Sequence, residues 1–308
     1  MAQHCMSMDT QQETHPYIYK NSSFYANNGS SSPGSGAVSA SQCKCIGIID
    51  SNFQNNLGIA LSIKFTQGEC ETSDIYAYPP LFNLSTIAGN GDSYLHQYVH
   101  DTILGGSTSV DIRTTTFKGN ADSTFLQGVD TEAVATGLKG GAGLNLLSTQ
   151  RIMLFDLHFD DNQAWQGGVL LLDLCYAAVI WSSTFTNNVA TQGGGAIASV
   201  NNVHYGGLFI GNTSATINRA GTTGGALYGA DQASITIGNG TVFGSNVAFT
   251  DGGAVACMEC ASLTFQDQVV LEVNNALAAG GALYVDSSSA IQSINTTYYG
   301  NWYDPLPT

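Results

Sequence analysis

The chain has 308 residues, of which only 10% are charged, and its eight basic residues leave a formal net charge of −15. Globular chains carry about 25% charged residues, so uncharged polar residues must provide most of the solubility here. The acidic balance argues against nucleic acid and anionic membrane surfaces as partners, because both would repel the chain. The 43% hydrophobic content argues against disorder.

The N-terminal part of the chain is less regular than the rest. Residues 1–16 are polar and are predicted to be disordered or poorly docked. From residue 17 onward, an apolar residue, two variable residues and Asn recur, but over 17–135 this pattern is irregular. Phe82 and Phe117 are 35 residues apart, which is longer than the usual period. The excess predicts a loop insertion near 86–112, because extra residues leave a repeat as loops.

Over 136–303 the repeat is regular and contains two sequence motifs. A Gly-Gly pair precedes a small and an aliphatic residue, and the second glycines, 27 to 30 residues apart, include Gly195, Gly225, Gly253 and Gly281. The apolar-x-x-Asn motif supplies Asn162, Asn188, Asn218, Asn246, Asn274 and Asn301. Two motifs that recur with the same period over six repeats indicate a stacked array of repeats.

The residue pattern within each repeat indicates strands. Apolar residues alternate in short runs, as in Ile235 and Ile237 or Leu263 and Phe265, and alternation with period two is typical of β-strands. Two or three short strands in about 28 residues fit one coil of a parallel β-helix. We therefore predict an all-β fold in which residues 17–303 form one β-solenoid of about nine to ten coils.

The repeated residues have predicted structural roles. Paired glycines allow positive φ or close backbone approach where the chain bends. Asparagine tolerates the left-handed region, and its amide both donates and accepts hydrogen bonds. Stacked from coil to coil, the repeated asparagines are predicted to form an internal amide ladder. The apolar residues that precede them, such as Phe159, Phe185 and Phe243, are predicted to stack beside it.

The combination of GGA[ILV] and FxxN resembles the repeat of the polymorphic outer membrane proteins, the Pmp autotransporters of chlamydiae, and of similar algal surface proteins. The resemblance is clearest over 117–301. It implies a right-handed parallel β-helix and an adhesin-like role at the cell surface. No signal peptide or membrane anchor is visible in the sequence. We therefore expect an extracellular or cell-surface fragment of a larger protein, with no membrane insertion by this segment.

The seven cysteines leave several alternatives open. Cys257 and Cys260 could form a short disulfide at a turn, and a disulfide between Cys45 and Cys70 could link neighbouring coils. Cys175 and Cys260 are predicted to share one corner but to lie three coils apart, beyond disulfide reach. A single CxxC without a second pair is weak evidence for metal or redox chemistry.

Asp156, His158 and Asp160 are the candidate surface binding residues. Phe159 is predicted to face inward, and strand side chains alternate, so the three polar side chains are predicted to face outward together. Such a group could bind calcium, a sugar or a partner protein. The alternative is that these outward positions are simply polar. No catalytic residue and no obligatory cofactor is predicted.

We therefore expect a non-catalytic module that acts as a rigid scaffold or an adhesin-like surface, with carbohydrate or protein partners at a cell surface. The alternative is a carbohydrate-active enzyme of the pectate lyase or polygalacturonase type, since those enzymes share the β-helix fold. Their sites need paired carboxylates with a nearby His or Arg. The chain has no Gly-His-Gly or Arg-Ile-Lys motif, and its only adjacent aspartates are Asp160 and Asp161.

Overall fold

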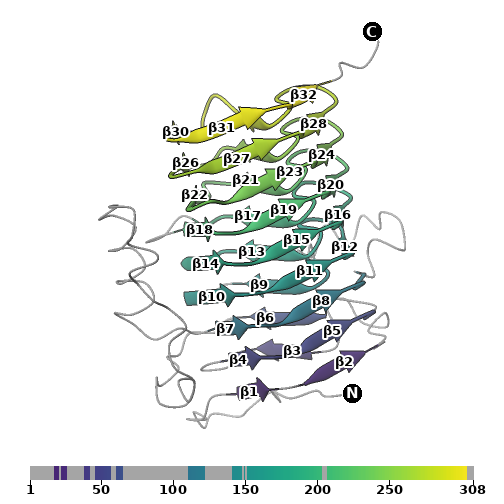
Figure 1. Ribbon diagram of the computed structural model, residues 1–308. Helices are drawn as coiled ribbons and strands as arrows, with labels where there is room; N and C mark the ends of the chain where they lie inside the picture. The colour runs from purple at the N-terminus through teal and green to yellow at the C-terminus, as the bar shows by residue number, and fades with distance from the viewer. Residues whose placement is uncertain are drawn as a thin grey trace, which may run out of the picture.

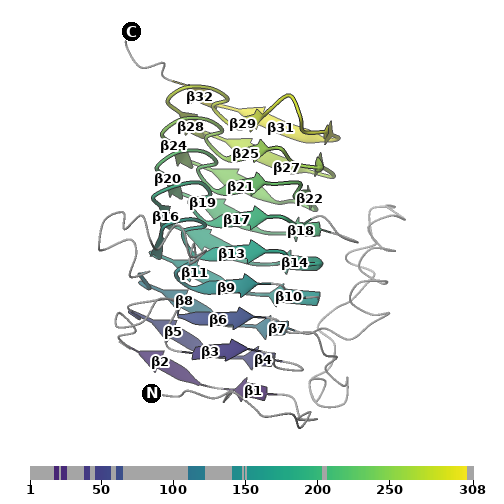
Figure 2. The same cartoon turned by 180° about the vertical axis from the view of Figure 1, so that it is seen from behind.

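The computed structural model describes residues 17–20, 22–25, 38–41, 46–56, 60–64, 110–121, 141–147, 149, 151–202 and 207–303. All secondary-structure elements within these ranges are β-strands, and the strand pairs among them are parallel. The strands form four sheets that run along one axis (Figure 1; Figure 2). The predicted right-handed parallel β-helix is confirmed.

We name the sheets A to D, in the order in which the chain visits them within a coil. Sheet A contains β1 (Tyr17–Lys20), β4 (Ile46–Ile49), β7 (Val110–Arg113), β10 (Arg151–Phe155), β14 (Ala177–Trp181), β18 (Gly207–Gly211), β22 (Ser234–Gly238), β26 (Ser262–Phe265) and β30 (Ile291–Ser293). Sheet B contains β2 (Ser23–Tyr25), β5 (Asn52–Gln54), β8 (Thr116–Lys118), β11 (His158–Asp160), β15 (Thr184–Thr186), β19 (Ser214–Thr216), β23 (Val242–Gly244), β27 (Val269–Glu272) and β31 (Thr296–Tyr299).

The other two sheets complete each coil. Sheet C contains β12 (Gln163–Ala164), β16 (Val189–Ala190), β20 (Arg219–Ala220), β24 (Val247–Ala248), β28 (Asn275–Ala276) and β32 (Trp302–Tyr303). Sheet D contains β3 (Val38–Ser41), β6 (Leu61–Lys64), β9 (Leu144–Leu147), β13 (Leu170–Asp173), β17 (Ile197–Val200), β21 (Leu227–Ala230), β25 (Val255–Met258) and β29 (Leu283–Val285).

The number of turns and strands differs slightly from the prediction. The described strands complete about seven turns, slightly fewer than the predicted nine to ten coils; among the described residues, sheets A and B have nine strands each, sheet D has eight and sheet C has six. A regular coil contains four strands rather than the two or three predicted from sequence. The additional strands belong to sheet C, and each has only two residues, as in Val189–Ala190. Runs this short show no alternation that a sequence pattern can reveal.

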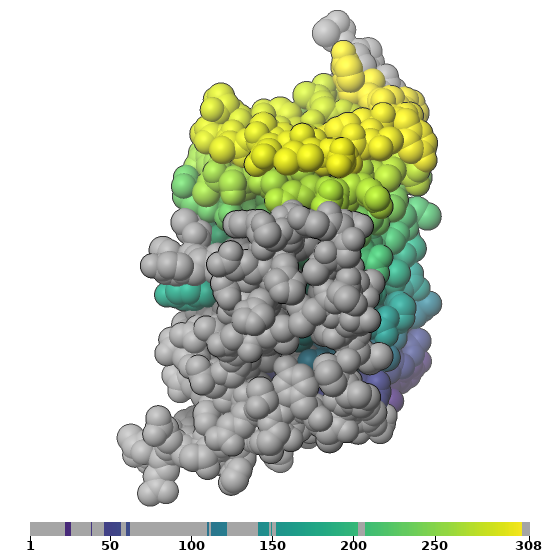
Figure 3. All heavy atoms as spheres, turned by 60° about the vertical axis from the view of Figure 1, so that its left-hand side comes forward, coloured from purple at the N-terminus to yellow at the C-terminus, as the bar shows by residue number. Residues whose placement is uncertain are grey.

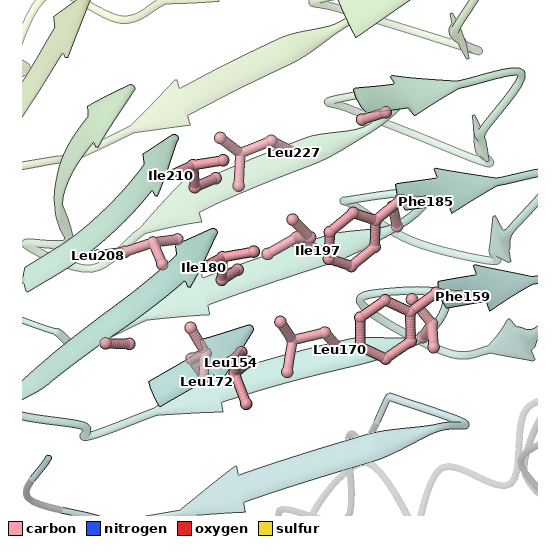
Figure 4. Close-up of a cluster of buried hydrophobic side chains, with 14 of the residues drawn as sticks. Leu154, Phe159, Leu170, Leu172, Ile180, Phe185, Ile197, Leu208, Ile210 and Leu227 are labelled. Carbon is pink, nitrogen blue, oxygen red and sulfur yellow. The ribbon is translucent and has the colours of Figure 1, made fainter. Parts of the chain in front are cut away.

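Rows of inward side chains from neighbouring coils form the core (Figure 4). In sheet B the inward row is aromatic at first: the rings of Phe117 and Phe159 stack at 5.0 Å and those of Phe159 and Phe185 at 4.5 Å between centroids. Leu170 and Ile197 face these rings from sheet D. Each such side chain contributes about 1.5–3 kcal/mol when buried, and every coil shares its contacts with the two beside it.

The two glycines of each pair have different requirements. The first glycine bends the chain with positive φ, as at Gly252 with φ 67° and Gly280 with φ 63°. The second lies directly under the next coil. A Cβ atom at Gly253 would overlap the carbonyl oxygen of Gly281, and a Cβ atom at Gly225 would overlap that of Gly253. The pair is therefore needed both for the turn and for the close stacking of coils.

Asparagine side chains connect the coils through the interior. Asn246 donates from Nδ2 to Asn274 Oδ1 at 3.0 Å and to the Ala215 carbonyl at 2.9 Å. Its own Oδ1 accepts from the backbone N–H of Asn218 at 2.9 Å and from Asn218 Nδ2 at 3.1 Å. The same pattern links Asn56, Asn120, Asn162, Asn188, Asn218, Asn246, Asn274 and Asn301. Both amide protons and the oxygen of each inner asparagine are therefore bonded.

The left-handed backbone conformation does not fall on these asparagines, contrary to the role expected from sequence. It falls on the residue directly before each one, as at Asn187 with φ 56°, Ile217 with φ 60° and Val273 with φ 55°. The turn places the following Asn side chain inside, where its amide bonds to the next coil. Asparagine is therefore needed at the ladder for its amide group rather than for its backbone tolerance.

Two of the domain expectations fall mostly outside the described residues. Residues 1–16 lie outside them entirely. Of the predicted insertion near 86–112, the structure describes only 110–112, which belong to strand β7. Strand β7 pairs with β4 on one side and β10 on the other. The regular stacking of sheet A therefore already includes Val110–Arg113.

Candidate functional site

The candidate residues lie on and beside β11, in the middle of sheet B. Strand β11 pairs with β8 on one side and with β15 on the other. His158 and Asp160 are on its outer side, because Phe159 between them is buried in the core. Alternation along the strand thus places these two polar side chains on one surface.

Asp156 is placed differently. It lies in the turn between β10 and β11, where its φ is 53°, and Leu157 after it is buried. Its backbone N–H donates to the carbonyl of Trp181 at 3.0 Å. The alternation that was assumed to run from Asp156 to Asp160 begins only at His158. Asp156 is therefore a corner residue, whereas His158 and Asp160 share the face of the sheet.

Asp160 forms an ion pair with a residue that the sequence analysis did not select. Lys118 Nζ on β8 lies 2.7 Å from Asp160 Oδ2. The hydrogen bond to Asp160, together with its negative charge, raises the pKa of Lys118 above the usual lysine value. The two side chains are 50% and 40% exposed, so solvent screens the pair and its contribution to stability is small. The pair nevertheless orients the Asp160 carboxylate along the sheet.

His158 is in contact with the other neighbouring strand. Its Nδ1 lies 3.0 Å from Thr184 Oγ1 on β15. Beyond it the outward side chains are hydroxyl-bearing and half-buried, namely Thr184 and Thr186 on β15 and Ser214 and Thr216 on β19. We call His158, Asp160 and these four residues the polar face of sheet B. It is a continuous surface of hydrogen-bonding groups on rigid strands.

The carboxylates around β11 do not gather into a metal site. In the part of the chain that the structure describes, no three His, Cys, Asp or Glu side chains are close enough to hold a metal ion. Asp160 is paired with Lys118, and Asp161 accepts a hydrogen bond from Asn187 Nδ2 at 3.3 Å. The described carboxylates beside β11 are thus engaged in an ion pair and a hydrogen bond.

The outer face of sheet A is unlike that of sheet B. Met153, Val179 and Phe209 are paired neighbours that alternate with the core residues, so they face away from the core. They are nevertheless only 1–2% exposed. Trp181 joins this row, with its ring 6.2 Å from that of Phe209. The pattern of alternation did not predict this outer apolar row, although the five consecutive apolar residues Ala177–Trp181 were a signal for a strand buried on both faces.

Cys175 and Cys260 lie in the corner between sheets D and A, and Cys257 lies on β25 of sheet D. Cys257 and Cys260 form a disulfide within one turn, as one of the sequence alternatives proposed. Cys175 is a buried free thiol whose Sγ lies 3.4 Å from the carbonyl oxygen of Leu146. Burial raises the pKa of this thiol to about 12. Cys175 is therefore protonated and shielded at neutral pH, which makes it a structural rather than a reactive cysteine.

Comparison with known protein families identifies one segment of the chain. The Chlamydia polymorphic membrane protein repeat matches residues 182–200. This segment contains Phe185 to Asn188 and the Gly194-Gly195-Ala196-Ile197 run, so it includes both sequence motifs of one repeat. No curated protein and no solved structure matches the chain. Among the residues described, no helix has the length and apolar character to cross a membrane. The chain is a parallel β-helix protein, and one of its repeats matches the Pmp type.

Proposed function

We propose that this chain is a non-catalytic β-solenoid module of a larger cell-surface or extracellular protein. It serves as a rigid scaffold that presents an adhesin-like binding surface. The observation that carries the proposal is the continuous asparagine ladder within a Pmp-type repeat. That repeat is named after the polymorphic membrane proteins of Chlamydia, which supports a surface location.

Rigidity follows from how the coils are joined. Each inner coil is hydrogen-bonded to two neighbours through four sheets and through its ladder asparagine. No coil can shift along a strand without moving its Asn amide and its core side chains out of register at the same time. Such an array transmits force and keeps a fixed separation between what lies at its two ends, which is what a scaffold on a cell surface requires.

The polar face of sheet B is the proposed binding surface. Its hydroxyl groups, together with the His158 ring and the Asp160 carboxylate, can donate to and accept from the hydroxyl groups of a carbohydrate or the backbone of a protein. The strands hold these groups at fixed spacings, so little conformational entropy is lost on binding. A carbohydrate or protein at a cell surface is therefore the proposed partner, whereas the net charge of −15 disfavours nucleic acid.

Binding to a panel of neutral and acidic glycans and to intact cells tests this surface. The double variant Thr186→Val/Thr216→Val removes two hydroxyl groups from the polar face without changing side-chain shape. Thr236→Val, on the outer side of sheet A, is the matched control. We expect the double variant to lose at least about tenfold in affinity, equivalent to ~1.4 kcal/mol. Equal binding by the double variant and wild type would remove the polar face from the proposal.

The same proteins test the enzyme alternative. Wild type is incubated with the polysaccharides, with and without calcium, and new reducing ends and unsaturated products are measured. The pairing of Asp160 with Lys118 and the bonding of Asp161 to Asn187 support the non-catalytic proposal, because neither carboxylate is left as an unpaired acid or base. We expect no turnover. Product formation that disappears in Asp160→Asn would establish a carbohydrate-active enzyme instead.

A further inference from the structure

Large apolar side chains are exposed together on sheet C and on the corner that precedes it. Ile217 and Val273 at this corner are 57% and 49% exposed, and Phe249, directly after β24, is 38% exposed. They belong to coils that Figure 3 colours green, and β20, β24 and β28 of these coils are consecutive neighbours at the right of Figure 1. Single exposed apolar residues are ordinary, whereas a group of them on a rigid surface indicates an interaction site.

The backbone at Ile217 and Val273 is unfavourable for the residues that occupy it. Both have positive φ, 60° and 55°, which is rare for β-branched residues because their side chains crowd the backbone in this region. The same corner in other described coils holds residues without a branch at Cβ that accept this conformation more readily, namely Asn55, Gly119, Asp161, Asn187, Ser245 and Gly300. A polar residue would therefore suit the coil better, and a contact outside the chain is the physical reason for an apolar one.

Arg219 adds a positive charge to this apolar surface. Its Cζ atom lies 4.6 Å from the centroid of the Phe249 ring, where the negative face of the ring attracts the cation and orients it. Arg219 is exposed, and it pairs in register with Val247 on β24. No carboxylate of the described residues forms an ion pair with it. The guanidinium is therefore available to donate two parallel hydrogen bonds to a carboxylate of another molecule.

We propose that Ile217, Arg219, Val247, Phe249 and Val273, which we call the sheet C patch, bind a segment of another protein in which a carboxylate is flanked by aliphatic side chains. The carboxylate pairs with Arg219, and the aliphatic groups cover Ile217 and Val273. Strand β24 is already paired with β20 and β28, so recognition occurs through side chains rather than by addition of a strand. The patch is separate from the polar face of sheet B and does not depend on the function proposed for that face.

The chemistry of the patch selects this kind of partner. A protein segment fits better than a carbohydrate, because the corner presents aliphatic side chains where a sugar would require hydrogen-bonding groups. The net charge of −15 disfavours a second copy of this chain and any partner that is rich in acidic residues. The partner is therefore neutral or basic outside the carboxylate that meets Arg219.

A displayed library of short random peptides, selected on the immobilised full chain, supplies the probe. The enriched peptides are expected to contain an acidic residue between aliphatic residues. Fluorescence anisotropy then measures the affinity of an enriched peptide and of a copy in which the acid is replaced by its amide. Wild type is expected to bind the acidic peptide at least about tenfold more tightly than the amide copy, whereas Arg219→Gln is expected to bind both equally.

Ile217→Asn separates binding from folding. Asparagine accepts the left-handed conformation and already occupies the same corner at Asn187. The variant is therefore expected to melt at the same temperature as wild type or higher, and yet to lose at least about tenfold in affinity for the acidic peptide. Asp161→Asn, which places asparagine at the same corner in a coil outside the patch, is the matched control and is expected to bind as wild type does.

Other outcomes would overturn the proposal. Enrichment of no peptide, or only of peptides that lack an acidic residue, would remove the carboxylate partner. Equal affinity of Ile217→Asn and wild type would place binding elsewhere on the chain. Dimerisation of wild type in analytical ultracentrifugation that Ile217→Asn abolishes would assign the patch to a second copy, and neutral-glycan binding that Ile217→Asn abolishes would assign it to a carbohydrate.

Discussion

The outer faces of sheets A and B share one backbone geometry but differ in chemistry. On sheet A, Met153, Val179 and Phe209 face away from the core and are almost fully buried. On sheet B, the outward side chains are polar, from His158 on β11 to Thr184 on β15. The inner faces of both sheets are uniformly apolar. Stacking of the coils thus requires apolar residues on the inner faces, whereas the residue types on the outer faces can differ from sheet to sheet. A specific function must therefore depend on the outer faces.

The largest effect that we expect is that of a charge on the outer face of sheet A, compared with the same charge on the outer face of sheet B. Val179→Asp puts a carboxylate in a site that is 1% exposed, and should lower the free energy of unfolding by about 4 kcal/mol, because the buried charge has no partner. Thr184→Asp on the polar face should change it little, since that side chain reaches solvent. Urea denaturation measures both. Equal losses would mean that the two faces do not differ as described.

Breaking the ladder should have the next largest effect. Asn246→Leu removes the Oδ1 acceptor of the backbone N–H and of Nδ2 of Asn218, and should cost about 3 kcal/mol. Asn275→Leu is the matched control, because the Oδ1 atom of Asn275 has no hydrogen-bond partner. If denaturation midpoints fall equally for the two variants, the ladder is not a specific source of stability.

Replacement of the second glycine tests the close stacking of coils. In Gly253→Val, the added side chain meets the backbone of the next coil at Gly281, which should cost about 2–3 kcal/mol. Ala254→Val should be milder, because Val169 already occupies the equivalent position in another coil. Thermal melting of both variants gives the comparison. A milder effect for Gly253→Val than for Ala254→Val would show that the glycine is not a stacking requirement.

The smallest expected effect is a pH dependence from Cys175. Its folded pKa is raised from 9.0 to about 12 by burial, so its contribution to stability is complete below pH 9 and is lost as the pH rises towards 12. At pH 10 the loss should be about 1 kcal/mol. The Cys175→Ala variant has no thiol at this position, so its stability does not show this pH dependence. The stability difference between wild type and Cys175→Ala should therefore narrow between pH 7 and pH 10, and a constant difference would contradict the assignment.

Sequence alone was sufficient for the inner part of the fold. Two motifs, one containing Phe185 and Asn188 and the other Gly194 and Gly195, recur at a constant spacing along the sequence. This spacing predicted the coil, because stacking demands the same residue at the same place in each turn. It did not predict the left-handed turn at Ile217, since a β-branched residue is unfavourable there and only the surrounding coils impose that conformation.

The candidate site was less predictable, since its contacts join residues that are far apart in sequence. Lys118 pairs with Asp160 across 42 residues, and no local pattern reveals that β8 and β11 are neighbours. Asp156 was assigned to the outer face by assuming that the strand begins two residues earlier than it does. The buried outer row at Met153 depends on how the rest of the molecule is arranged rather than on strand alternation.

The central claim is that one coil is the structural unit, defined by the spacing of its ladder asparagines. Deletion of residues 219–246 removes one period of 28 residues and joins Asn218 to Val247, which follows the equivalent asparagine in the next coil. The measurement is circular dichroism during thermal unfolding, with deletion of residues 219–232 as the out-of-register control. We predict a β-rich protein with one cooperative transition for the full-coil deletion and loss of cooperativity for the control. Loss of the fold in both deletions would contradict the account.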